Sequence, residues 1–350
     1  MTPEIALLNE QVASKRQLRQ AELAHHGIYT NIPNTQTFKG KSLLACGNRI
    51  TWLDKENATF HELILANLRH ELGDEWFDAE RAKLTADQHF VVQCAAQYEQ
   101  YMRSGGIQPE QHDNNQYSAM ANGYVQVVLS LAFDLYLLRH KNCGSEAVVK
   151  RLKTKREYQS ARYEIAVASI FARADCSINW IEPMRRGPKT PEFVAHCPLT
   201  DNFVAVEAKS KHPRGVMHED GSFDLQKALR GDVAKLFHSA LAKETNGLPY
   251  MIFIDMNAPH SFTKTATSQW YKDLQAMMKR EHHPTPDDPD IFNELIATNF
   301  APHYDKDRIV SPGQFAVVQP LFVKHKLNNN DVLLGRINMA ASEYGPVPNL

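Results

Sequence analysis

Residues 203–209, which read FVAVEAK, constrain the fold of this chain more than any other segment. Successive side chains of a β-strand point to opposite faces, so Glu207 and Lys209 would project from one face of the strand that this segment predicts. Pro191 and Glu192 open the apolar segment just before it. The spacing suits a hairpin that brings two carboxylates and an ammonium group to one sheet edge. Two carboxylates can hold a hard divalent cation, and a nearby lysine can orient water or offset phosphate charge.

These motifs resemble the PD-(D/E)xK nuclease superfamily, the fold of many restriction endonucleases. The resemblance rests on Pro191-Glu192, on Glu207-Ala208-Lys209, and on Glu164 in the helix expected before them. It covers about residues 155–258. One departure is visible, because the first motif is Pro-Glu where the family usually has Pro-Asp. Glutamate keeps the charge and adds a methylene group, which would shift the geometry around a metal.

The resemblance implies metal-dependent hydrolysis of phosphodiester bonds, with Mg²⁺ or Mn²⁺ as the cofactor. Glu192, Glu207 and the backbone carbonyl of Ala208 would bind the metal. Lys209 would position the attacking water and stabilise the charge that develops on the phosphate. Glu164 would reach the site as a metal ligand or through a water, and its alternative is an ordinary exposed helix glutamate.

Basic residues gather around the same motifs. Residues 150–214 hold 13 Lys and Arg against 7 Asp and Glu, although the formal net charge of the chain is −1. A basic zone on a neutral protein suits a binder of the phosphate backbone, and a solvated face with paired charges would have the same composition. We expect phosphate contacts from basic residues that flank the motifs: Arg162, Arg185, Arg186, Lys189, Lys211 and Arg214.

The predicted elements divide the chain into two parts. Helices are predicted at 3–25, 59–72, 74–83, 85–103 and 123–140, with a hairpin over 42–53 and a polar loop at 108–122. We therefore expect residues 1–145 to form a mainly helical domain that serves target recognition, partner binding or dimerisation.

The second part, residues 146–350, is predicted to be a nuclease-like α/β domain. We expect a helix at 145–173, in one part or two, strands at 177–182, 192–197 and 203–211, a helix at 225–243 and a strand at 250–256. This order, αβββαβ, is the core topology of the superfamily that the chain resembles, a restriction endonuclease-like mixed sheet flanked by helices. Farther along, the pattern predicts helices at 267–279 and 291–299 and strands at 314–323 and 332–337.

Composition argues against several other classes of protein. The five cysteines are scattered without a CxxC motif, which favours a reducing, cytoplasmic compartment over a disulfide framework or a zinc site. The first residues lack the apolar segment of a secretory signal. The most apolar segment, 124–138, contains Gln126, Ser130 and Asp134 and is too short to span a bilayer, so we expect a buried helix there.

We therefore expect a metal-dependent endonuclease that acts on DNA in restriction or anti-phage defence, a context that rests on analogy with the superfamily. RNA is the alternative substrate. Two other functions stay open. The first is a catalytically inactive module that keeps the nuclease fold and binds nucleic acid or a protein partner. The second is a structural or interaction protein whose Glu–Lys pairs are incidental. A homodimer and a partner protein bound through the N-terminal domain are both compatible with the sequence.

Overall fold

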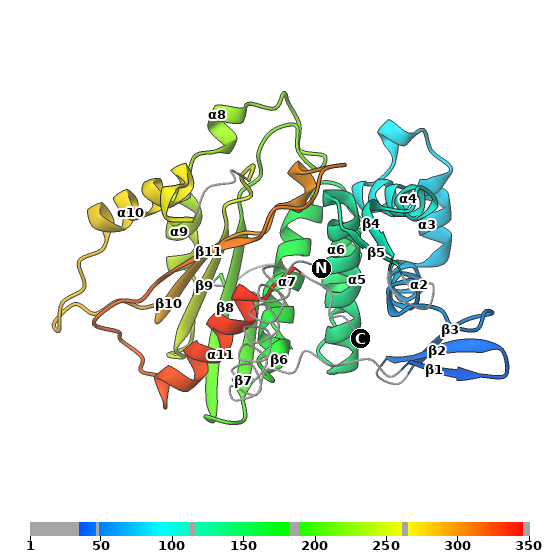
Figure 1. Ribbon diagram of the computed structural model, residues 1–350. Helices are drawn as coiled ribbons and strands as arrows, with labels where there is room; N and C mark the ends of the chain where they lie inside the picture. The colour runs from blue at the N-terminus through cyan, green and yellow to red at the C-terminus, as the bar shows by residue number, and fades with distance from the viewer. Residues whose placement is uncertain (1–34, 47–48, 112–116, 183–188, 261–264, 346–350) are drawn as a thin grey trace, which may run out of the picture.

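The computed structural model describes residues 35–46, 49–111, 117–182, 189–260 and 265–345. A helical N-terminal region is followed by a six-stranded mixed sheet packed with helices (Figure 1). The predicted α/β class and the mainly helical first part are thus confirmed. The helix predicted at 3–25 lies outside the described residues.

Helices dominate the N-terminal region, as the sequence predicts. They are α2 (Phe60–Leu72), α3 (Asp74–Arg81), α4 (Phe90–Arg103) and α5 (Gly123–His140). Helix α5 is the predicted apolar helix, and its side chains are buried continuously from Val127 to Leu138 because α2, α4 and α7 (Tyr158–Arg173) pack around it. One hydrophobic core therefore joins the N-terminal helices to the sheet.

Two small antiparallel sheets accompany these helices. The strands β1 (Thr35–Phe38), β2 (Lys41–Cys46) and β3 (Arg49–Leu53) include the predicted hairpin. The strands β4 (Ile107–Gln111) and β5 (Tyr117–Met120) form a second hairpin where a polar loop was predicted. That prediction was wrong because this hairpin is held by backbone hydrogen bonds and carries little of the apolar alternation by which strands are recognised.

The six-stranded sheet has the order β11-β10-β9-β8-β7-β6. Its strands are β6 (Ser177–Trp180), β7 (Phe193–Cys197), β8 (Asn202–Ser210), β9 (Tyr250–Asp255), β10 (Glu294–Asn299) and β11 (Gln314–Val318). Strands β8, β9 and β10 are parallel, and the other neighbours pair antiparallel. Along the chain, α7, β6, β7, β8, α9 (Ala234–Leu241) and β9 follow the predicted order of helix, three strands, helix and strand.

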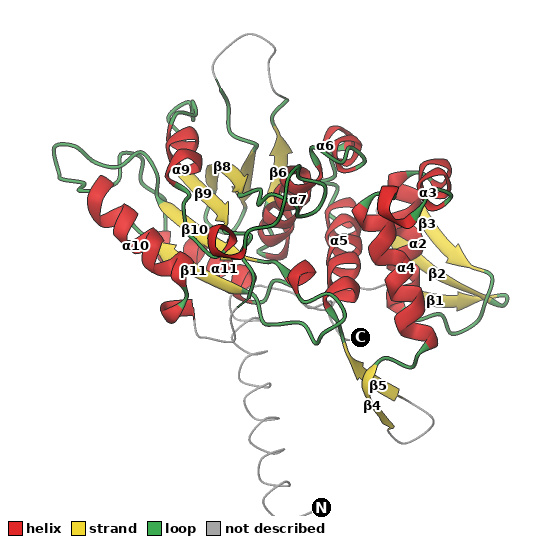
Figure 2. Ribbon diagram, turned by 90° about the horizontal axis from the view of Figure 1, so that it is seen from above, coloured by secondary structure: helices red, strands yellow, loops and turns green. Residues whose placement is uncertain are grey.

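Helices cover both faces of this sheet (Figures 1 and 2). Helices α7 and α11 (Asn330–Ser342) contact the face that also borders α5, and α9 packs on the opposite face near α10 (Gln269–Glu281). Alternation along β8 places Val206 in the hydrophobic core that includes α7, and Ala205 in a separate core that includes α9. Glu207 and Lys209 therefore share the face of Ala205, on the side of α9.

Other predicted elements also differ from the structure. Residues 291–299 form β10 rather than a helix, because this strand is buried at all six positions and lacks any alternation that would identify it. Residues 332–337 lie inside α11 rather than in a strand. The helix predicted at 225–243 is divided into α8 (Leu225–Ala228) and α9. Gly231 lies between them, where an added Cβ would come within 2.3 Å of the Trp270 carbonyl oxygen.

Candidate active site

Two glutamates lie beside each other where β7 and β8 pair. Glu192 immediately precedes β7, and its backbone N–H donates to the Val206 carbonyl at 3.0 Å. Phe193 is the register partner of Val206, and Glu207 is the next residue of β8. The antiparallel register thus brings the two predicted acids together, as the sequence pattern requires.

Lys209 joins these two acids. Its Nζ lies 3.5 Å from Glu192 Oε1 and forms a closer ion pair with Glu207 Oε1. Ala208, the residue between Glu207 and Lys209, packs its side chain into the core on the other face of the sheet. Three of the four predicted catalytic side chains are therefore in direct contact.

A second lysine, which no sequence pattern marks, completes this cluster. Lys243 follows the C-terminal end of α9, and its Nζ lies 3.0 Å from Glu207 Oε1. The same nitrogen donates to the Thr190 carbonyl at 2.7 Å. Lys243 thereby ties the segment that leads into Glu192 to the carboxylate of Glu207.

The electrostatics of the cluster follow from its burial. Glu207 has no exposed surface, and burial together with the negative charge of Glu192 raises its pKa, while Lys209 and Lys243 lower it in part. Burial acts to lower the pKa of Lys209, but the charges of Glu207 and Glu192 outweigh it and raise that pKa. Lys209 therefore keeps its positive charge at neutral pH.

Glu164, the fourth predicted residue, is buried on α7 rather than exposed on a helix surface. Arg151 of α6 (Glu146–Leu152) donates to both of its carboxylate oxygens, at 2.7 and 2.6 Å. Burial and the nearby charge of Glu192 raise the pKa of Glu164 to about 7, against the opposing effects of Arg151 and Lys209. Glu164 thus interacts electrostatically with the cluster, while its oxygens are held by Arg151.

The predicted phosphate contacts fall into three groups. Arg162 is buried, with Nη2 at 3.4 Å from Asp255, and Lys211 donates to the Lys227, Ala228 and Arg230 carbonyls at the end of α8. Both cations thus have partners within the protein in this structure, where they were expected to contact phosphates. Lys189 and Arg214 are exposed. Arg185 and Arg186 lie outside the described residues.

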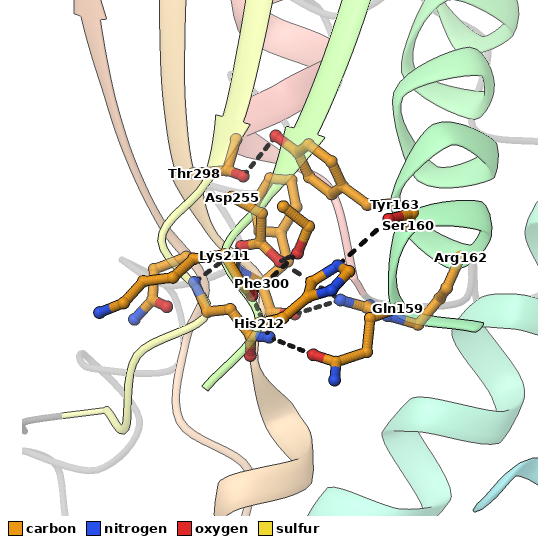
Figure 3. Close-up of polar contacts among 12 residues, drawn as sticks. Gln159, Ser160, Arg162, Tyr163, Lys211, His212, Asp255, Thr298 and Phe300 are labelled. Carbon is orange, nitrogen blue, oxygen red and sulfur yellow. Dashed lines mark hydrogen bonds and ion pairs between the residues drawn. The ribbon is translucent and has the colours of Figure 1, made fainter. Parts of the chain in front are cut away.

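A polar network that the sequence did not predict lies at the ends of β8 and β9 (Figure 3). Asp255 accepts hydrogen bonds from the Asn257 and Phe300 backbone N–H groups, both at 3.3 Å. Ser160 Oγ lies 3.1 Å from His212 Nε2, and the Tyr163 hydroxyl lies 2.8 Å from Thr298 Oγ1. These contacts, with that of Arg162 and Asp255, join the N-terminal half of α7 to the ends of β8, β9 and β10.

Whether a divalent cation fits this cluster depends on how its carboxylates are arranged. No group of three or more His, Cys, Asp and Glu side chains in the described ranges is arranged to hold a metal. Glu207 Oε2, however, is buried and has no hydrogen-bond partner among the described residues. Mg²⁺ is usually bound by one or two carboxylates and keeps several waters. The pair Glu192 and Glu207 fits that mode of binding.

Comparisons with protein-family models, with curated proteins and with solved structures found no match. Of the helices that the structure describes, none combines the length and apolar character needed to cross a membrane.

Proposed function

We propose that this protein is a metal-dependent nuclease with a restriction endonuclease-like core. The observation that carries the proposal is the contact of one ammonium group, that of Lys209, with the carboxylates of both Glu192 and Glu207. Further support comes from the element order αβββαβ and from the sheet order β6-β7-β8-β9, in which β6, β7 and β8 form an antiparallel meander and β9 is parallel to β8.

Each residue of the cluster has a role in this proposal. Glu192, Glu207 and the backbone carbonyl of Ala208 would hold Mg²⁺ or Mn²⁺. When bound, such a cation lowers the pKa of a water and offsets negative charge on the phosphate. Lys209 orients the attacking water and stabilises the developing charge. Lys243 holds the Glu207 carboxylate in place, and the Arg151–Glu164 pair sets the electrostatic field around Glu192.

DNA is the substrate that we favour, in the context of restriction or anti-phage defence. The basic residues around the cluster support a polyanionic substrate, and the exposed side chains of Lys189 and Arg214 are available for phosphate contacts. RNA carries the same backbone charge, so it is tested beside DNA.

The test is cleavage of supercoiled plasmid DNA and of a folded RNA in Mg²⁺, Mn²⁺ or EDTA. Wild type is compared with Lys209→Met, with Glu207→Gln and with Lys227→Met, whose lysine side chain is 85% exposed and serves as the matched control. We expect metal-dependent cutting that falls by about 100-fold or more in the first two variants and is unchanged in the control. Full activity in Lys209→Met or Glu207→Gln would overturn the assignment.

A second candidate is a non-catalytic module that keeps the fold and binds nucleic acid or a protein partner. The observation that favours it is that two of the buried glutamates already have cationic partners. Lys209 and Lys243 contact Glu207, and Arg151 pairs with Glu164. Calorimetric titration with Mn²⁺ separates the two candidates. Salt-dependent DNA binding without metal binding or cleavage would establish this module and exclude the nuclease.

A further inference from the structure

A cavity of about 340 Å³ lies where the N-terminal helices meet the sheet domain. Its size falls within the range of small-molecule sites. Helices α4 and α5, the loop that follows β8 and the segment that follows β10 each contribute to it. Six of its lining residues carry aromatic or imidazole rings: Phe90, Tyr124, His218, Phe223, His303 and Tyr304.

The rings are arranged around Tyr304. Its centroid lies 4.3 Å from that of His303 and 5.8 Å from that of Phe223. Phe90 meets His303 edge to face, with centroids 6.4 Å apart and an interplanar angle of 90°. Phe223 is 46% exposed, so much of its surface lies open to solvent or to a ligand. A planar aromatic ligand could cover that surface by stacking.

The residues that line the cavity also include a buried histidine and a lysine. His303 is 6% exposed, and its Nε2 has no hydrogen-bond partner among the described residues. Burial lowers the pKa of His303 well below its usual value, so the ring is neutral at pH 7. Lys306 is exposed, and none of the lining residues is Asp or Glu. An aromatic ligand with a negative group suits the aromatic rings and the lysine of this lining.

The loop that supplies Phe223 is held in place by its own hydrogen bonds. The Gly215 N–H donates to the Glu219 carbonyl at 2.9 Å, and the Glu219 N–H donates to the Val216 carbonyl at 3.0 Å. His218 Nε2 accepts a hydrogen bond from the Phe90 N–H at 2.7 Å, which ties the loop to the start of α4. The part of the loop at residues 215–219 is therefore fixed against α4, which reduces the entropic cost of ordering this wall of the cavity on binding.

We propose that this cavity binds an unpaired nucleobase that stacks on Phe223 and Tyr304, with its attached phosphate near Lys306. Stacking on aromatic side chains beside a cation is how proteins hold unpaired bases. The base can belong to a single strand or to a free mononucleotide. Binding here needs neither metal nor cleavage, so the inference goes beyond the proposed nuclease activity.

The test uses the full chain in EDTA, so that it is independent of the carboxylate cluster. One probe is a short single-stranded oligothymidylate that carries a single 2-aminopurine, and the other is the 5′-monophosphate of 2-aminopurine riboside. Stacking of the base quenches its fluorescence. Phe223→Ala is compared with Phe223→Trp, which keeps a stacking surface, and with Phe203→Ala, which removes a phenylalanine of similar exposure, 50%, from the body of β8.

We expect saturable quenching by at least one probe and a loss of affinity of about 5- to 150-fold in Phe223→Ala, with little change in Phe223→Trp and Phe203→Ala. Quenching by the oligonucleotide alone identifies a base within a strand, and quenching by the monophosphate alone identifies a free nucleotide. The absence of saturable quenching with both probes, or an equal loss in the two alanine variants, would overturn the proposal.

Discussion

The ammonium nitrogen of Lys209 lies 3.5 Å from a carboxylate oxygen of Glu192, and the same nitrogen is ion-paired with Glu207. Glu192 precedes one strand and Lys209 belongs to the next, so the contact depends on the antiparallel register of β7 and β8. Two carboxylates and an ammonium group are thereby concentrated in one contact cluster, in which Glu192 and Lys209 both shift the pKa of Glu207.

Mg²⁺ should raise the free energy of unfolding of the wild-type protein and leave that of Glu207→Gln unchanged. A ligand that binds only the folded state at about 100 times its dissociation constant adds about 3 kcal/mol to the free energy of unfolding. The measurement is the unfolding midpoint with and without Mg²⁺. Glu244→Gln, which removes an exposed glutamate just beyond Lys243, is the control and should respond as wild type does. Equal shifts in all three proteins would contradict the site.

Arg151→Ala should destabilise the fold by about 3 kcal/mol, because it leaves the Glu164 carboxylate, only 4% exposed, without the guanidinium that holds both of its oxygens. The double variant Arg151→Ala/Glu164→Gln should recover much of that loss, because it removes the buried carboxyl group that has lost its partner. Urea unfolding of the two single variants and the double variant gives the coupling energy. If the stability changes of the two single variants add up to that of the double variant, the interaction between Arg151 and Glu164 contributes nothing to stability.

The stability of the protein should depend on pH through Asp134. Burial raises the pKa of Asp134 to about 6 from 3.8, although Arg173, Ser169 and Tyr344 act to lower it. Because the folded state then binds more protons than the unfolded state over that range, Asp134 makes stability fall as pH rises from about 4 to about 6. The difference between the two pKa values corresponds to about 3 kcal/mol.

Asp134→Asn removes this titration, so the unfolding free energy of wild type relative to the variant should decline over the same range and be level above it. The Ser169 and Tyr344 hydroxyls, each 2.6 Å from Asp134, still have hydrogen-bonding partners in asparagine. Urea unfolding of both proteins at several pH values is the measurement. A constant difference between them would show that Asp134 does not titrate in the folded state.

Gly215→Ala should lower the free energy of unfolding more than Gly105→Ala does. Gly215 belongs to the loop that lines the aromatic cavity. Both glycines have positive φ, +72° and +80°, so alanine costs about 1 kcal/mol of backbone strain at either position. At Gly215 the new Cβ would also lie 2.8 Å from the Phe223 backbone nitrogen, whereas at Gly105 nothing lies within 4 Å.

That additional contact should cost about 1–3 kcal/mol and weaken binding of the 2-aminopurine probes. Chemical denaturation and the fluorescence titration measure the two effects. Equal losses of stability in both variants, with binding unchanged, would mean that the loop relaxes without moving Phe223.

Much of the fold could be predicted because its signals are local. The alternation in residues 203–209 determined which side chains of β8 share a face, and the mainly apolar segment of α5 predicted its burial. Strand β10 was misassigned as a helix because a strand buried on both faces has no period to detect.

The candidate site likewise has some contacts that the sequence predicted and others that it did not. The sequence by itself determined that Glu192, Glu207 and Lys209 meet, because the hydrogen-bond register of adjacent strands follows from short-range pattern and connection length. Only the tertiary structure decided that Lys243 contacts Glu207, that Arg151 holds Glu164 and that Arg162 is buried against Asp255. These contacts join elements far apart in the chain, and they arise from the packing of helices on the sheet, which leaves no periodic trace in the sequence.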